Sequence, residues 1–228
     1  MQPTVDLNII LKDLHILKDY TKNDCEIVIT RFDESLEWAL QLDHLTTVYN
    51  KGPTPLNFST VRNISNFGMG LETNLRHIIE RYDSLSKMTF FCQGRIADRI
   101  DQPLFPFIYY LTNPNVNEIR CYKSVAYDPP TWRYTNRISN PSCETLYGDL
   151  AIFRKNIVQI PYKHYNEYWV KGDWICVGRN LIHRHPKAYY EDLYNACKFT
   201  RGMAVEELWF LERSLYSIFT NNSNFAKA

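Results

Sequence analysis

The chain has no apolar run that reaches the roughly 18–20 residues needed for a membrane-spanning helix. Near the N-terminus, Asp6, Lys12 and Asp13 interrupt any apolar core, so the sequence does not predict a signal peptide. We therefore expect a cytoplasmic protein without a membrane span.

The chain also lacks an excess of charge of either sign. Its 26 basic and 25 acidic residues leave a formal net charge of +1. Nucleic-acid partners usually require a strong basic excess, so none is expected, although a local basic pocket is compatible with this balance. The six cysteines form no Cys-x-x-Cys pair, which indicates reduced thiols rather than a disulfide framework or a zinc site. The P-loop and the Gly-x-Ser-x-Gly turn of other common α/β enzymes are absent as well.

Short apolar strands alternate with helices in the first half of the chain. Strands are predicted at 25–30, 45–49 and 88–92, and a helix carries Leu71, Leu75, Ile78, Ile79 and Tyr82 on one face. This alternation predicts an α/β fold with a mainly parallel central sheet flanked by helices. Residues 58–65 fit no clear pattern.

The rest of the chain is predicted less regularly. Residues 4–20 and 103–111 have helical patterns, whereas 112–148 are rich in proline and are expected to form an irregular segment over a pocket. A strand is expected at 172–177 and helices at 180–194 and 203–219. The predicted organisation is an N-terminal helix or linker over 1–24, one domain over 25–219 and a flexible tail over 220–228.

Each early strand ends in a polar turn. The carboxyl ends of parallel strands meet at one edge of a sheet, so these turns are expected to form one pocket. Gly68 and Gly70, before the long helix, allow the backbone to approach closely. The turns are Thr30-Arg31, Asn50-Lys51-Gly52 and Gln93-Gly94-Arg95. The alternatives are that Arg31 pairs with Glu34 at the surface and that Asn50-Lys51-Gly52 is an ordinary turn.

Five blocks of the chain, taken in order, resemble a known family. They are CEIVITRFDESLEWAL, TTVYNKG, NFGMGLETNLRHIIERYDSLSKMTFFCQGR, GDWICVGRNLIHRHPKAYYEDL and FLERSLYSIF, and they cover nearly all of residues 25–219. The most specific parts are Tyr-Asn-Lys-Gly and Tyr-Asp-x-Leu followed by Gln-Gly. The blocks resemble the family called domain of unknown function 3431, which is itself similar to glycosyltransferases of the GT-A type.

This resemblance implies a single GT-A-like domain that moves a sugar from a nucleotide-diphosphate sugar to a glycan acceptor. A UDP-sugar is the favoured donor. The blocks are also similar to domains of multidomain glycan-building proteins of large algal viruses, including rhamnosyltransferases, so UDP-rhamnose is one candidate. The alternative is a non-catalytic carbohydrate- or nucleotide-binding domain that retains the fold.

The resemblance places the donor at the strand ends. The expected donor-binding residues are Thr30, Arg31, Asn50, Lys51, Gly68, Gln93, Gly94 and Arg95. Most GT-A enzymes hold a divalent metal with an Asp-x-Asp sequence at the third strand end, and this chain has none. Two hypotheses follow. Arg95 or Arg99 pairs with the diphosphate, or Asp98 holds Mg²⁺ or Mn²⁺ together with water and diphosphate oxygens.

An inverting transferase also needs a carboxylate that deprotonates the acceptor hydroxyl. The candidates are Asp173, Glu206 and Glu207. Glu212 matches the closing motif of the family, but a structural role in a buried network is its alternative. A retaining enzyme would not require such a base.

Overall fold

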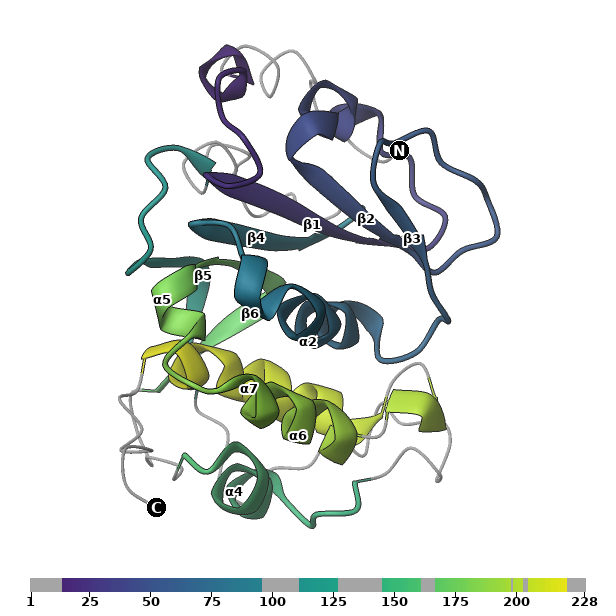
Figure 1. The fold of residues 1–228 in the computed structure, drawn as a ribbon. Helices are drawn as coiled ribbons and strands as arrows, with labels where there is room; N and C mark the ends of the chain where they lie inside the picture. Colours follow the sequence, from purple (N-terminus) through teal and green to yellow (C-terminus); the bar gives the residue numbers. More distant parts are fainter. Residues whose placement is uncertain are drawn as a thin grey trace.

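The computed structural model describes residues 14–95, 111–126, 145–160, 167–197, 199–202 and 205–220. Its centre is a six-stranded mixed sheet in the order β3-β2-β1-β4-β6-β5 (Figure 1). Strands β3, β2, β1 and β4 pair in parallel, whereas β6 is antiparallel to both of its neighbours, β4 and β5. The strands are β1 (Cys25–Arg31), β2 (Thr46–Asn50), β3 (Val61–Asn63), β4 (Met88–Gln93), β5 (Ile119–Ala126) and β6 (Glu167–Gly178). The prediction of an α/β protein is confirmed. The prediction of a mainly parallel sheet is not, because the sheet is mixed.

The central strands are buried on both faces. All residues of β1 and β2 are buried, as expected for parallel strands covered on both sides. Successive side chains of a strand point to opposite faces, so Val28 packs into one apolar cluster while Ile27 and Ile29 pack into the other. The sheet therefore separates two hydrophobic cores.

Helices cover the two faces unequally. One core contains the apolar faces of α2 (Met69–Arg81), α6 (Lys187–Cys197) and α7 (Glu206–Thr220), which lie on the same side of the sheet in Figure 1. The short α5 (Arg179–Ile182) and α4 (Leu150–Phe153), which continues as one π-helical turn over Arg154–Val158, join them. The other face is covered by the 3-10 helices η1 (Leu14–Leu17) and η2 (Glu37–Leu45). None of the helices in the described ranges has the length and apolarity needed to cross a membrane.

Several predicted elements differ from those observed. The helix predicted over 180–194 is two helices, because Pro186 lacks an N–H and disfavours helical backbone in the preceding residue. The prediction of an irregular 112–148 is wrong for Ile119–Ala126, which form β5. The unclear segment 58–65 contains β3. Most of the predicted helices over 4–20 and 103–111, and almost all of the tail, lie outside the described residues.

Candidate functional site

The polar turns that follow β1, β2 and β4 lie side by side at one edge of the sheet. The strand register places Arg31 opposite Asn50 and Thr30 opposite Gln93. Backbone hydrogen bonds of 2.7 and 2.8 Å continue the pairing one residue beyond β2 and β4. The predicted meeting of these three turns is therefore confirmed.

Arg31 points inward and holds the loop that follows β2. Its Nη1 donates hydrogen bonds to Asn50 Oδ1 (2.8 Å) and to the Thr54 carbonyl (3.0 Å), and its Nε donates to the Glu34 carbonyl (3.1 Å). The Asn50 amide in turn donates to Asn63 Oδ1 (3.0 Å), which joins β2 to β3. Arg31 thus shapes the loop from within and is only 4% exposed.

Lys51 is also buried, and it joins the end of β2 to the start of α2. Its Nζ donates hydrogen bonds to the Phe67 carbonyl, to the Met69 carbonyl (2.7 Å) and to Glu72 Oε2 (2.9 Å). The side chain of Lys51 and that of Glu72 are both 2% exposed. The charge of Lys51 is therefore compensated inside the protein by an ion pair with Glu72.

Two glycines allow the backbone to approach its neighbours at this edge. At Gly52 a Cβ atom would lie 1.4 Å from the Phe32 carbonyl oxygen. Gly68 has a φ of +59°, and a Cβ there would lie 2.5 Å from Glu72 Cβ and 2.6 Å from Phe199 Cδ1. No other residue fits either position without a shift of the surrounding backbone or side chains.

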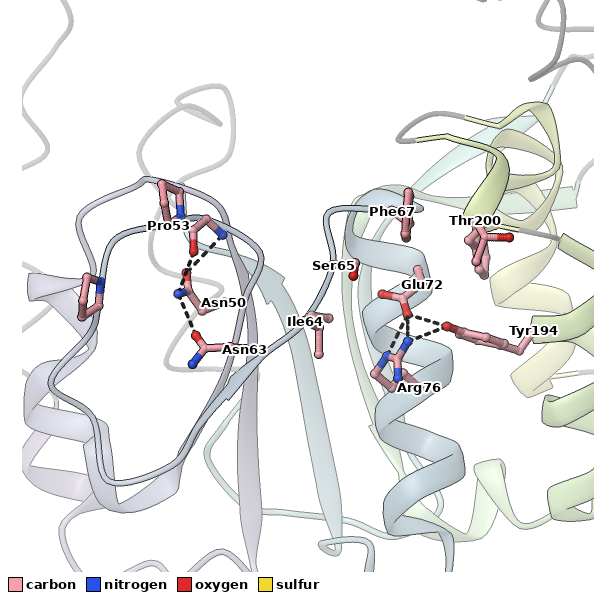
Figure 2. A pocket seen from close by; sticks show the side chains of 13 residues that line it. Asn50, Pro53, Asn63, Ile64, Ser65, Phe67, Glu72, Arg76, Tyr194 and Thr200 are labelled. Atoms are coloured by element: carbon pink, nitrogen blue, oxygen red, sulfur yellow. Dashed lines mark hydrogen bonds and ion pairs between the residues drawn. The ribbon is translucent and has the colours of Figure 1, made fainter.

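A pocket of about 730 Å³ opens between these segments (Figure 2). The loop after β2 and the end of β3 form one wall, with Asn50, Pro53 and Asn63. The opposite wall comes from the start of α2, the end of α6 and η7 (Phe199–Arg201). It presents Phe67, Glu72, Arg76, Tyr194 and Thr200, while Ile64 and Ser65 lie between the walls.

A hydrogen-bonded cluster of Glu72, Arg76 and Tyr194 forms the polar part of the second wall (Figure 2). Arg76 Nε and the Tyr194 hydroxyl each donate to Glu72 Oε1, at 2.7 Å in both cases. Arg76 Nη2 donates to the Tyr194 oxygen at 2.6 Å. Burial and the neighbouring Glu72 raise the pKa of Tyr194 to about 12, so its hydroxyl keeps its proton at neutral pH.

The third strand end contributes nothing to this pocket. Gly94 accepts a hydrogen bond from Trp38 Nε1 (3.1 Å), and Gln93 ends β4, which lies on the far side of β1 from β2. Of the eight predicted donor-binding residues, only Asn50 lines the 730 Å³ pocket. Lys51 and Gly68 do not line it, but both contact residues at the start of α2, in its second wall. The pocket is thus displaced toward β3 from the position expected.

The predicted acid–base residues whose side chains the structure describes do not line this pocket. Glu206 and Glu207 are fully buried at the start of α7, where their carboxylates accept hydrogen bonds of 2.9 Å from the backbone N–H groups of residues 145 and 146. Glu212 is 6% exposed in the middle of α7. Asp173 belongs to β6, but its side chain is not among the described ones, and Asp98 lies outside the described residues.

The described part of the pocket does not fit a divalent cation. No group of three His, Cys, Asp or Glu side chains that could hold a metal occurs among the described residues. The carboxylate in the pocket wall, Glu72, is already bound by two cations and a hydroxyl. The proposal that Asp98 holds a metal stays a prediction, because that residue is outside the described part of the chain.

Among the pocket residues that sequence reasoning missed are three with polar side chains, Asn63, Arg76 and Tyr194. Arg76 follows Glu72 by four residues on a predicted helix, and this spacing is a known signal for an ion pair. Asn63 lies in a segment that had no clear pattern. Tyr194 is 118 residues from Arg76 in the chain, so no local pattern could have paired them.

No family model, curated protein or solved structure matches the chain in comparisons with known proteins. The family and the activity suggested by the five blocks therefore remain predictions.

Proposed function

We propose that this protein is a glycosyltransferase that binds a nucleotide-diphosphate sugar, with a UDP-sugar favoured, and transfers the sugar to a glycan acceptor. The main support is the position and size of the pocket. It lies at the carboxyl ends of parallel strands, where open α/β sheets commonly bind ligands. Its volume of about 730 Å³ is within the range of about 300–1,000 Å³ typical of small-molecule sites.

The chemistry of the walls suits a nucleotide. Phe67 and Phe199 offer apolar surface to a base, and the exposed side-chain amide of Asn63, which Asn50 holds in place, offers polar groups to a base or ribose. Pro53 and Pro55 stiffen the opposite loop, which reduces the entropy lost when a ligand orders it. Rhamnose remains one candidate for the sugar.

One observation favours a second candidate, a nucleotide- or carbohydrate-binding domain without catalysis. Glu72 is the single carboxylate among the described residues that line the pocket. Both of its oxygens already accept hydrogen bonds, from Lys51, Arg76 and Tyr194, so neither is placed to take the proton of an acceptor hydroxyl. A binding domain would need no such base.

Thermal unfolding with UDP-, GDP- and dTDP-sugars tests the proposal, followed by measurement of nucleotide release in the presence of glycan acceptors. A bound donor should raise the melting temperature as its concentration rises. Asn63→Ala should weaken this shift. The matched control is Asn117→Ala, because Asn117 bonds to Asn180 at the opposite edge of the sheet. Binding without sugar transfer would favour the second candidate, and no shift with any nucleotide sugar would overturn the transferase and leave only a domain that binds carbohydrate.

A further inference from the structure

Arg76 is the single cationic residue among the described residues that line the pocket. It lies one turn beyond Glu72 on α2, on the wall that faces Asn50 and Asn63 (Figure 2). Its side chain is 33% exposed, whereas the neighbouring Lys51 is 2% exposed and lies behind Glu72. An anion that enters the pocket would therefore meet the guanidinium of Arg76 first.

The contacts of Arg76 leave one edge of the guanidinium open. Nε donates to Glu72 Oε1 at 2.7 Å, and Nη2 donates to the Tyr194 oxygen at 2.6 Å. Nη1 lies 3.7 Å from Glu80 Oε1, which is longer than a hydrogen bond. Glu72 and Tyr194 thus hold Nε and Nη2 of the guanidinium in place. The two N–H groups of Nη1 make no hydrogen bond.

The surrounding charges leave a positive balance at this wall. Lys51, Arg62 and Arg76 are cations, and Glu72 and Glu80 are the two carboxylates that pair with them. Tyr194 is neutral because its pKa is raised to about 12 by burial and by Glu72. One net positive charge therefore remains, and an arginine fork suits the oxygens of a phosphate better than a lysine does.

We propose that Arg76 binds the diphosphate of the nucleotide sugar through Nη1, with Glu72 and Tyr194 as positioning residues. This inference rests on the proposed function. During transfer, the bond between the anomeric carbon and the β-phosphate oxygen breaks, and its electron pair stays on that oxygen. The acceptor hydroxyl oxygen forms the new bond to the anomeric carbon, and its proton passes to solvent water. Arg76 stabilises the extra negative charge that develops on the departing UDP.

The test compares the affinities of UDP and uridine, measured by calorimetry in a buffer with EDTA. For the wild-type protein UDP should bind more tightly than uridine. In Arg76→Gln the affinity for UDP should fall about tenfold to hundredfold, as expected for lost hydrogen bonds to a charged group, and that for uridine should stay the same. Arg76→Lys, which keeps the charge but not the fork, should lie between the two.

Arg62→Gln is the matched control. It removes the same charge from the same network, but Arg62 pairs with Glu80 and is not among the residues that line the pocket. The inference is overturned if Arg76→Gln binds UDP as tightly as the wild type, if Arg62→Gln loses as much, or if wild-type UDP binding requires Mn²⁺ in place of EDTA. If the wild type binds neither UDP nor uridine in either buffer, the proposed function fails for a UDP-sugar donor, and with it this inference. Should Arg76→Gln not fold, Arg76→Lys decides the matter in the same assay.

Discussion

At the scale of single residues, the chain places ionised groups inside the protein and satisfies them there. Glu26, in the middle of the sheet, is 2% exposed, yet its Oε1 accepts a hydrogen bond of 2.6 Å from the Thr47 hydroxyl. Its Oε2 lies 3.4 Å from His77 Nε2. His77 Nδ1 in turn contacts the Tyr49 hydroxyl at 3.2 Å, and Tyr49 donates to Glu80 (3.1 Å) at the protein surface. A chain of polar contacts thus connects Glu26 in the core to Glu80 at the surface.

Glu26 should make the free energy of unfolding depend on pH in the acidic range. Burial alone would raise the pKa of Glu26, but the hydrogen bond and charge of His77, together with the Thr47 hydroxyl, lower it from 4.5 to about 2. The unfolded chain therefore binds a proton more readily than the folded protein. The stabilisation, about 3 kcal/mol, is complete above pH 4.5 and is lost as the pH falls toward 2.

Urea unfolding from pH 7 to pH 3 measures this effect in the wild type and in Glu26→Gln. The variant should be less stable at pH 7 by about 3 kcal/mol, and the difference should shrink at low pH. Asp24 also has a pKa lowered to about 2, but it is present in both proteins, so the difference between the two curves isolates Glu26. Parallel curves would show that the Glu26 carboxylate is not held in its ionised form.

At the scale of elements, the end of β2 and the start of α2 are tied together by the buried ion pair of Lys51 and Glu72. The pair forms where Gly68 starts the helix in a left-handed conformation without a side-chain cap. Lys51 also binds the Phe67 and Met69 carbonyls, so it orients the whole first turn of α2. The contact of Lys51 with the start of α2 therefore fixes the distance between the two walls of the pocket, because β2 leads into one wall and α2 belongs to the other.

Lys51→Met should therefore destabilise the protein strongly. Removing one partner of a buried ion pair usually costs about 3–5 kcal/mol, because the remaining charge loses its compensation. Arg76 and Tyr194 still bind Glu72 in the variant, so the lower end of this range is expected. Chemical unfolding at pH 7 measures the change.

Two further variants separate this explanation from a general loss of charge. Lys87→Met removes a lysine whose pair with Asp24 is 50% and 29% exposed, and it should cost less than about 1 kcal/mol. The double variant Lys51→Met with Glu72→Gln should be more stable than the sum of the two single changes predicts. Additive effects would mean that the two side chains do not stabilise each other.

At the scale of the whole molecule, strands β1, β2, β4 and the second half of β6 could be predicted from the sequence, whereas β3, β5 and the pairing of β5 with β6 could not. Strands β1, β2 and β4 are short, apolar and separated by helices, so local patterns indicate them. The pairing of β5 with β6 joins segments about 50 residues apart, such as Arg120 with Cys176, and no local pattern determines it. A mixed sheet follows from such distant pairing.

Only part of the candidate site could be predicted from the sequence. The meeting of three strand ends followed from the parallel order, because the carboxyl ends of such strands share one edge. The directions of the side chains could not be predicted from this order. Arg31 and Lys51 point inward because they donate hydrogen bonds to loop carbonyls, and the paths of those loops depend on tertiary contacts. The opposite wall requires α6 to pack against α2, and this contact brings Tyr194 to Arg76.

The position of the pocket leads to a prediction for hydrogen exchange across the whole chain. Without ligand, the amides of β1 and β4 should exchange most slowly, because both strands are central and buried, and those of the three-residue edge strand β3 should exchange fastest within the sheet. With saturating UDP, exchange should slow in residues 50–55 and 61–68, which form the pocket walls. Residues 115–118, which bond to Gly178 and Asn180 at the opposite edge, should not change. Protection at 93–95 instead would place the nucleotide at the ends of β1 and β4, where Gln93 ends β4 and Gly94 and Arg95 follow it, and would remove Arg76 from its proposed role.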